Sequence, residues 1–357
     1  MERFTIDLHG PLHGMEYGGE GPLVLLVHGL SGSAVNWMET AVPLTAYGRV
    51  VAPELPGFGR TPPAGRSASM QAQAGLMADF IEYQGGGPAL VIGNSMGAMI
   101  SMILAGQRPD LVDRLVLIDT PGSTADLEGL PPAWITSMLM YLVPGANLMY
   151  VNWLRRQGTP EQTTDTALDL LAGAQGRMSP RVRRLHAGVA AERNAMPWPP
   201  HAYLEAFRSI MANLVPFSRW RRTALLVSAP TLLIHGTHDQ VVPISAAERL
   251  AALRPDWSYR PLVGVGHIAM LEAPDLLLEV VAEFMDRAPA RRNGLASVPS
   301  GPGPGDEAVH RPGVGDHVAA HPASLSLEDT PNRLIQFPRV VRVGGDDDEH
   351  APPPGLE

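Results

Sequence analysis

The first 120 residues alternate short apolar runs with longer amphipathic stretches. Residues 23–27 read LVLLV, a continuous apolar run typical of a strand that is buried on both faces. Because helical stretches separate this run from similar ones, the pattern predicts an α/β fold, with a mostly parallel sheet flanked by helices. The other expected strands are residues 4–8, 50–53, 89–93 and 115–119, and the expected helices are residues 37–46, 69–83 and 96–107.

Residues 121–222 break this alternation. Four of the six tryptophans lie here, at positions 134, 153, 198 and 220, and prolines recur between short apolar segments such as 134–142 and 146–154. No run typical of a buried strand is present. We therefore expect a helical cap, inserted after the strand that ends at Asp119.

The alternation of strands and helices returns after the expected cap. Residues 1–120 and 223–287 together are expected to form the core, with residues 231–235 and 257–263 as strands and 244–253 and 274–287 as helices. Residues 288–357 are rich in Pro, Gly and Asp, a composition that predicts a disordered tail. Within it, residues 334–343 (LIQFPRVVRV) are apolar enough to dock on the body.

Composition and charge exclude several classes of function. Hydrophobic residues make up 45% of the chain, enough for a sizeable core, and the net charge of −9 disfavours a nucleic-acid partner. There is no cysteine, which excludes disulfides and a thiolate nucleophile. The N-terminus does not read as a secretory signal, and the longest apolar runs are too short for a stable membrane span, so a cytoplasmic protein is expected.

Residues 93–97, GNSMG, carry the strongest chemical signal. An expected buried strand precedes them and an expected helix follows, which is the context that a G-x-S-x-G nucleophile elbow requires. In such a turn the serine hydroxyl stands above the sheet edge, and the flanking glycines avoid collisions with neighbouring backbone. Ser95 is therefore the expected nucleophile.

A serine hydroxyl needs a base, and the base needs an orienting carboxylate. His267 lies in GVGHIAMLEAP, between the last expected strand and the last helix, and Asp239 lies in HGTHDQVVP after another buried strand. Both positions are carboxyl ends of strands, where open α/β sheets collect their sites. We expect His267 as the base and Asp239 as the acid, with Asp119 as the alternative acid because it also ends a buried strand.

A glycine turn after another buried strand, HGLSG at residues 28–32, is the expected oxyanion hole. The backbone N–H of Leu30 and that of Met96 are the expected donors. His28 is expected to brace this loop. His235 and His238 are expected to be structural, and no metal site is expected because no third ligand is near them in the sequence.

The chain resembles the α/β-hydrolase superfamily. The resemblance covers residues 4–287 and rests on HGLSGS, ELPGFGRT, GNSMG, GTHDQVVP and GVGHIAMLEAP, which stand in the family's order, with Glu54 where the family usually has Asp. It implies that Ser95, Asp239 and His267 form a catalytic triad that works through an acyl-enzyme and needs no cofactor. A serine nucleophile disfavours the dehalogenase and epoxide-hydrolase members.

The substrate class remains open at this level. Tryptophans and methionines of the expected cap, with Trp134, Met138 and Trp153 as candidates, favour an apolar pocket and a hydrophobic ester of modest size, although such residues also build ordinary cores. The GNSMG motif is also similar to that of carbon–carbon hydrolases acting on dienoic acids from ring cleavage. That substrate carries a carboxylate, for which Arg155, Arg193 and Arg208 are candidates. A ligand-binding protein without catalysis is the third possibility, and the oligomeric state is left undetermined.

Overall fold

A computed structural model describes residues 1–122, 132–173, 178–215 and 217–287, and for residues 132–135, 137, 217 and 218 it describes the backbone alone. The described residues belong to one compact unit. The expected tail, residues 288–357, lies outside the described residues, and so does its apolar segment at 334–343.

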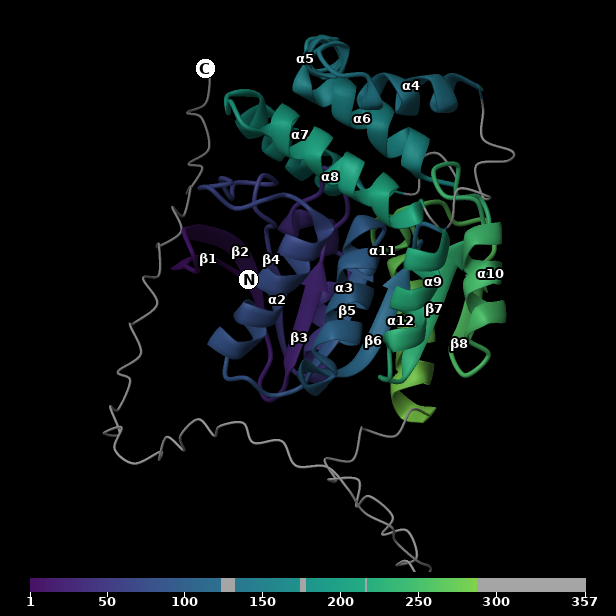
Figure 1. Ribbon diagram of the computed structural model, residues 1–357. Helices are drawn as coiled ribbons and strands as arrows, with labels where there is room; N and C mark the ends of the chain where they lie inside the picture. Colours follow the sequence, from purple (N-terminus) through teal and green to yellow (C-terminus); the bar gives the residue numbers. More distant parts are fainter. Residues whose placement is uncertain (123–131, 174–177, 216, 288–357) are drawn as a thin grey trace, which may run out of the picture. The chain divides into compact units, whose positions relative to one another are not determined.

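The described residues form an eight-stranded, mostly parallel sheet with helices on both faces, which confirms the expected fold class (Figure 1). The strand order is β1-β2-β4-β3-β5-β6-β7-β8, and only β2 runs antiparallel to its neighbours. The strands are β1 (Glu2–Asp7), β2 (Pro11–Gly18), β3 (Leu23–Val27), β4 (Arg49–Pro53), β5 (Ala89–Asn94), β6 (Val112–Ile118), β7 (Thr231–Gly236) and β8 (Ser258–Leu262).

Strand β2 was not expected, because its glycines at 14 and 18 resemble those of a turn. Its residues nevertheless largely alternate between buried and less buried positions, as a strand with one face on the core requires. Gly14 is needed here for space, since a Cβ at this position would collide with the ring of Phe4 on β1. A glycine inside a strand can thus reflect close approach of a neighbour.

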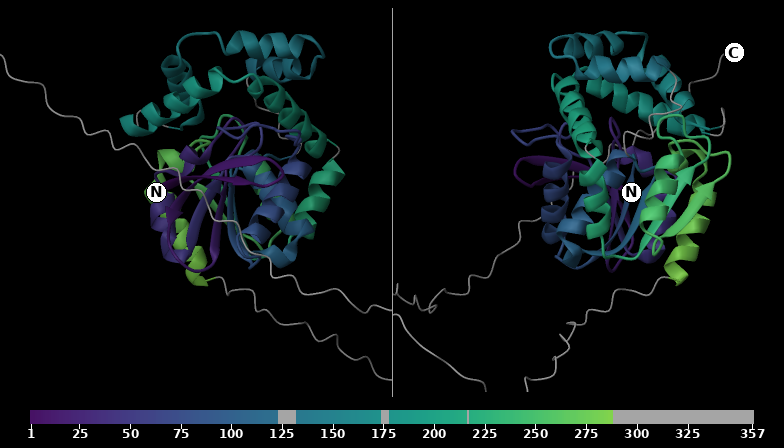
Figure 2. Two further views of the ribbon diagram at one scale, coloured as in Figure 1. Left: turned by 90° about the vertical axis from the view of Figure 1, so that its left-hand side faces the viewer. Right: turned by 45° about the vertical axis from the view of Figure 1, so that its right-hand side comes forward.

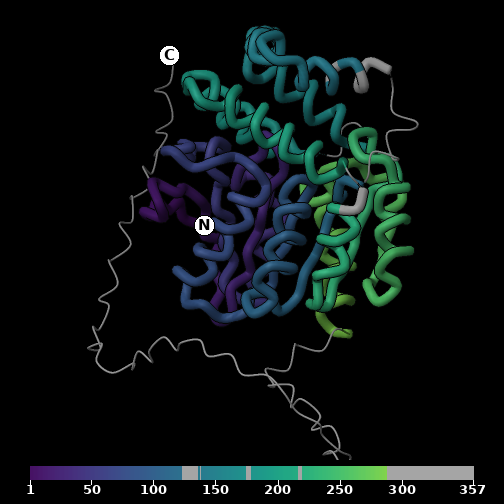
Figure 3. Tube along the Cα trace, viewed as in Figure 1, coloured from purple at the N-terminus to yellow at the C-terminus, as the bar shows by residue number. Residues whose placement is uncertain are grey.

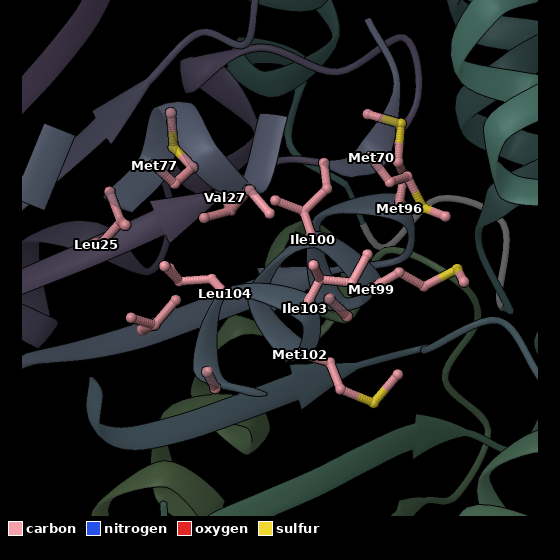
Figure 4. Packing of buried hydrophobic residues seen from close by; sticks show 14 of the residues in the cluster. Leu25, Val27, Met70, Met77, Met96, Met99, Ile100, Met102, Ile103 and Leu104 are labelled. Carbon is pink, nitrogen blue, oxygen red and sulfur yellow. The ribbon is translucent and has the colours of Figure 1, made fainter. Parts of the chain in front are cut away.

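Successive residues of the central strands face two different cores. In β3, Leu25 and Val27 lie in one buried cluster, whereas Val24 and Leu26 lie in the other. Figure 4 shows part of the first cluster, which includes Leu25 and Val27 together with methionines and branched side chains of the helix after β5. Burial on both faces explains why these strands read as continuous apolar runs.

The helices that flank the sheet mostly follow the sequence pattern. The exception is the helix expected at residues 37–46, which is replaced by three short helical turns, and Pro43 lies within the first turn of the middle one, where a missing N–H is tolerated. The flanking elements are η1 (Ala34–Trp37), α1 (Ala41–Leu44), η2 (Thr45–Tyr47), α2 (Met70–Tyr83), α3 (Met96–Gln107), η3 (Pro109–Leu111), α10 (Ser245–Leu253), α11 (Ala269–Glu272) and α12 (Pro274–Arg287).

Between β6 and β7, the described residues form six helices. Figures 2 and 3 show how this insertion is arranged beside the sheet. Four of them begin with a proline, a residue whose missing N–H and fixed φ suit the first helical position. The recurring prolines therefore mark helix starts, and Thr159 and Ser179 cap two of these helices with their hydroxyl groups. The helices are α4 (Pro132–Leu142), α5 (Ala146–Leu154), α6 (Pro160–Leu171), α7 (Pro180–Asn194), α8 (Pro199–Leu214) and α9 (Phe217–Leu226).

Helix α9 crosses the boundary that the sequence suggested at residue 222. Trp220 of this helix is buried in the same cluster as α3, and its indole N–H donates to the carbonyl of Pro121 at 3.2 Å. We use the name cap below for helices α4 to α8 and their connections. Within the described part of the chain, no helix is both long and apolar enough to cross a membrane.

Candidate active site

Ser95 lies at the turn between β5 and α3, in the backbone conformation that a nucleophile elbow requires. Its φ of 55° and ψ of −120° are rarely adopted by a residue with a side chain, and such strain costs roughly 1–3 kcal/mol. Both flanking glycines are required by space: a Cβ at Gly93 would collide with the Gly97 carbonyl, and one at Gly97 would collide with the carbonyl of Val27. The turn therefore forms only with this glycine pair.

His267 and Asp239 meet at the carboxyl ends of the last two strands. The Nδ1–H of His267 donates to Oδ2 of Asp239 at 2.6 Å, which is the contact expected of the base and the acid of a triad. The backbone N–H groups of Val241 and Val242 donate to Oδ1 of Asp239 at 2.7 and 2.9 Å. Because Nδ1 is engaged with the carboxylate, Nε2 is the ring nitrogen of His267 that can accept a proton.

The two groups shift each other's pKa in opposite directions. Burial acts to lower the pKa of His267, but the charge and hydrogen bond of Asp239, helped by the charge of Asp119, raise it above its ordinary value. For Asp239, burial acts to raise the pKa, and the charge and hydrogen bond of His267 hold it below its ordinary value. The pair therefore favours an imidazolium beside a carboxylate, the state that follows proton transfer to His267.

Asp119, the alternative acid, occupies a different position. Its Oδ1 accepts a hydrogen bond from the backbone N–H of Gly236 at 2.9 Å, and the same oxygen lies 3.9 Å from Nδ1 of His235. Burial raises the pKa of Asp119 to about 6, with the nearby charge of Asp239 adding to the effect and His235 opposing it. Asp119 is thus buried beside Asp239, and Asp239 is the residue that accepts the hydrogen bond from His267.

His235 is buried next to Asp119 and Asp239. Its Nε2–H donates to the carbonyl of Val242 at 2.9 Å, and Nε2 lies 3.6 Å from Oδ2 of Asp239. Oxygen and nitrogen atoms of Asp119, His235 and Asp239 lie within 4.8 Å of one another, close enough to suggest metal ligands. Because both oxygens of Asp239 already accept hydrogen bonds, we interpret this group as support for the acid.

The loop after β3, which contains the expected oxyanion donor Leu30, forms a tight turn. Ser31 has a φ of 61°, and the N–H of Gly32 donates to the carbonyl of Gly29 at 3.0 Å, so residues 29–32 form a tight turn. His28 braces it: Nδ1–H donates to the carbonyl of Gly29 at 2.8 Å and Nε2 accepts from the N–H of Leu55 at 3.0 Å. Burial lowers the pKa of His28 to about 4, which keeps the ring neutral.

The two expected oxyanion donors, the N–H groups of Leu30 and Met96, come from two different segments of the chain. Leu30 lines the same cavity as Ser95. Met96 is the first residue of α3, so its N–H belongs to the group that has no partner inside the helix. Both amides are thus compatible with binding an oxyanion beside Ser95.

Four hydrogen bonds that the sequence did not predict hold the His267 loop in place. The side-chain amide of Asn94 donates to the carbonyl of His267 at 3.1 Å, which ties this loop to the strand of the nucleophile. The N–H of His267 donates to the carbonyl of Leu171 in the cap at 2.7 Å. The buried carboxylate of Glu272 accepts from the N–H groups of Gly173 and Gly266 at 2.9 and 2.8 Å. Apart from the bond between Gly266 and Glu272, they join segments distant in sequence, so only the tertiary structure reveals them.

A cavity of about 350 Å³ joins Ser95 and His267 beneath the cap. Among the three pocket candidates, Met138 lines it. Trp153 does not: it is 56% exposed and stacks on Tyr150, while the side chain of Trp134 lies outside the described residues. Most of the wall is apolar and comes from Leu30, Leu171, Phe207, Ile210, Met211, Leu214, Val241, Val242 and Ile268.

The fold and this arrangement of side chains are those of a known protein family. Residues 22–274 match the family model described as alpha/beta hydrolase fold. This match covers more than half of the chain, and the chain belongs to this family.

Relatives within the family carry out more than one hydrolytic reaction. A pimeloyl-(acyl-carrier protein) methyl ester esterase of Aromatoleum aromaticum is 29% identical over 71% of this chain and 94% of its own length. A haloalkane dehalogenase 2 of Mycobacterium tuberculosis is 27% identical over 79% of this chain and 93% of its own length. The relatives support a hydrolase, without distinguishing the bond that it cleaves.

Solved structures support the same fold. A bacterial membrane phospholipase A aligns with a TM-score of 0.64 at 26% identity, covering 80% of this chain and 86% of its own. A 2-hydroxy-6-oxo-6-phenylhexa-2,4-dienoate hydrolase from Rhodococcus aligns with a TM-score of 0.61 at 21% identity, covering 80% of this chain and 98% of its own, a likeness of fold alone.

Proposed function

We propose that the protein is a serine hydrolase that cleaves carboxylic esters with an apolar acyl group. The observation that carries this proposal is one cavity that holds both Ser95 and a His267 ring hydrogen-bonded to Asp239 at 2.6 Å. The cavity wall is mostly apolar, which suits a hydrocarbon chain and leaves little room for a second polar group beside the ester.

In the proposed mechanism, Nε2 of His267 accepts the Ser95 proton while the hydroxyl oxygen attacks the ester carbon. The negative charge that develops on the carbonyl oxygen is stabilised by the N–H groups of Leu30 and Met96, each worth about 3 kcal/mol in the transition state. The alcohol leaves with a proton from His267, and an acyl-enzyme remains. Water, deprotonated by the same imidazole, then releases the acid and restores Ser95. These steps use side chains and backbone of this chain and no cofactor.

Two features of the site argue against the other chemistries of the family. Dehalogenation by this fold uses an aspartate nucleophile, whereas position 95 is serine. Carbon–carbon cleavage of a dienoic acid needs a cationic group for the substrate carboxylate in the reacting cavity. Arg155 and Arg193 line a neighbouring cavity instead, and Arg208 is exposed to solvent.

A panel of p-nitrophenyl esters of increasing acyl length tests the proposal, with a ring-cleavage dienoic acid assayed in parallel. We expect ester hydrolysis by the wild type, none above background by Ser95→Ala, and little cleavage of the dienoic acid. A fluorophosphonate probe should label the wild type and leave Ser95→Ala unlabelled. If the wild type neither hydrolyses esters nor reacts with the probe, the chain is a ligand-binding member of the family instead.

A further inference from the structure

A second cavity, of about 390 Å³, lies within the cap. Arg155 and Arg193 line it, together with Asn194 and apolar residues of α5 to α8. Ser31 and Tyr203 line both this cavity and the one that holds Ser95, so the two spaces are neighbours. The second cavity is therefore adjacent to the one that holds Ser95.

Arg193 is held in place by one strong contact and leaves other donors unused. Its Nη1 donates to the carbonyl of Ser31 in the oxyanion loop at 2.7 Å, while the buried Nε has no hydrogen-bond partner among the described residues. Burial, followed by the charge of Arg155, lowers the pKa of Arg193 to about 10. A buried donor without a partner is destabilising, so the position is unfavourable unless something else binds there.

Arg155 lies beside it with contacts of a similar kind. Its Nη2 donates to the carbonyls of Arg193 and Asn194 at 3.0 and 3.2 Å, at the carboxyl end of α7, and Nε donates to the side chain of Asn194 at 3.4 Å. These partners are neutral, so they orient the guanidinium without neutralising it.

Two acidic side chains in the surroundings of Arg193 have other partners. Glu192, which precedes Arg193, pairs with Arg60 at 2.6 Å. The buried Glu54 accepts the backbone N–H of Arg60 at 2.7 Å and lies 3.7 Å from the guanidinium of the same residue. Within the described ranges neither Arg155 nor Arg193 forms an ion pair, and the cavity is left with two positive charges.

We propose that this cavity binds an anionic group, a carboxylate or a phosphate, carried at the far end of the acyl chain whose ester lies at Ser95. Two guanidinium groups whose carboxylate partners are lacking recognise such oxyanions through charge-assisted hydrogen bonds. The apolar cavity beside Ser95 then holds the hydrocarbon between the two ends. The inference rests on the proposed function, and it narrows the substrate class to acyl esters with an anionic terminus.

The test compares p-nitrophenyl half-esters of dicarboxylic acids of increasing length with neutral methyl-capped partners of equal length. A second series carries a terminal phosphate in place of the carboxylate, which distinguishes the two anions. At the matching length we expect kcat/KM for the anionic ester to exceed that of its neutral partner by about tenfold or more, through a lower KM. Arg193→Gln and Arg155→Gln should each bring this ratio close to one, and Arg193→Lys should restore part of it.

Arg208→Gln is the matched control, because Arg208 is an exposed arginine of α8. It should keep the wild-type ratio. The proposal is overturned if no anionic ester of either series is preferred at any length, or if Arg208→Gln loses the preference as Arg193→Gln does. If no ester is cleaved at all, the proposed function fails. The cavity is then tested by thermal shift: dicarboxylates or phosphate monoesters should raise the Tm of the wild type and of Ser95→Ala, and should leave that of Arg193→Gln unchanged.

Discussion

Two groups of polar side chains, one around the triad in the sheet body and one around the second cavity in the cap, differ in their partners. At the carboxyl edge of the sheet, both ring nitrogens of His28 and both oxygens of Asp239 have partners within 3.0 Å. In the cap, Arg155 and Arg193 have no ion pair among the described residues. Complete hydrogen bonding holds a side chain in one position, whereas charged groups without an ion pair around a cavity can bind a ligand. We infer that the body carries the chemistry and the cap carries the selectivity.

The largest expected effect lies in the body. Replacing Ser95 with alanine should lower kcat by about 10⁴-fold or more, because members of a triad act as a unit. Ester hydrolysis measures the effect, and an unchanged circular dichroism spectrum and Tm serve as the control. Turnover near that of the wild type would show that the reacting group lies elsewhere.

The two buried carboxylates should differ sharply. Asp239→Asn should lower kcat/KM by roughly 10³-fold or more, because the amide no longer favours the imidazolium. Asp119→Asn should cost less than about tenfold, since its oxygen bonds the Gly236 N–H and an amide oxygen can do the same. Measuring kcat/KM for the two variants side by side shows which aspartate is the acid of the triad. A larger loss of kcat/KM in Asp119→Asn than in Asp239→Asn would reverse the assignment.

The pH profile should report the His267–Asp239 pair. Because the pKa of His267 is raised, kcat/KM should fall as the pH drops through a midpoint above about 6.5, where the ring becomes protonated and cannot act as a base. The stability of the fold depends on pH in the opposite direction. The ion pair contributes fully to the free energy of unfolding below the pKa of this histidine in the unfolded chain, and the contribution is lost as the pH rises through the pKa of His267 in the folded protein. Asp119→Asn removes a charge that raises this pKa and should shift the midpoint downward. An unchanged or higher midpoint would contradict the coupling.

Substitutions of the cavity wall in the cap should change selectivity. Met138→Ala and Met211→Ala enlarge the cavity beside Ser95 and should move the preferred acyl length upward, with several-fold changes in relative kcat/KM. Hydrolysis of the acetate ester serves as the reference for each variant. A length profile that stays flat while the Tm falls would mark these methionines as core residues.

The smallest effect is expected for Trp153→Ala. This tryptophan is 56% exposed and is not part of either cavity wall, so relative rates across the ester panel should change less than about twofold. The same panel measures it beside Met138→Ala. A clear change in acyl preference would show that the cap rearranges when substrate binds.

The sequence by itself determined the features that depend on neighbouring residues. Apolar runs such as 23–27 specify strands buried on both faces, and they predicted the sheet except for β2. The glycines of GNSMG are needed for a turn only a few residues long, so Ser95 could be placed before any contact was known. Prolines were recognised as interruptions. They are the first residues of the cap helices α4, α6, α7 and α8, because a proline lacks only a hydrogen bond that is absent there anyway.

The tertiary structure alone decided what depends on the register of distant segments. Asp119 and Asp239 both end buried strands, and only the folded chain shows that Asp239 bonds His267 while Asp119 bonds Gly236. Pattern likewise could not separate Met138, which lines the cavity, from Trp153, which faces solvent. Periodicity predicts which face of a helix is apolar, but the neighbour that covers this face comes from another part of the chain. Only the tertiary structure shows that Arg155 and Arg193 lie together without an ion pair among the described residues. The reason is that the side chains surrounding a charge come from distant parts of the sequence.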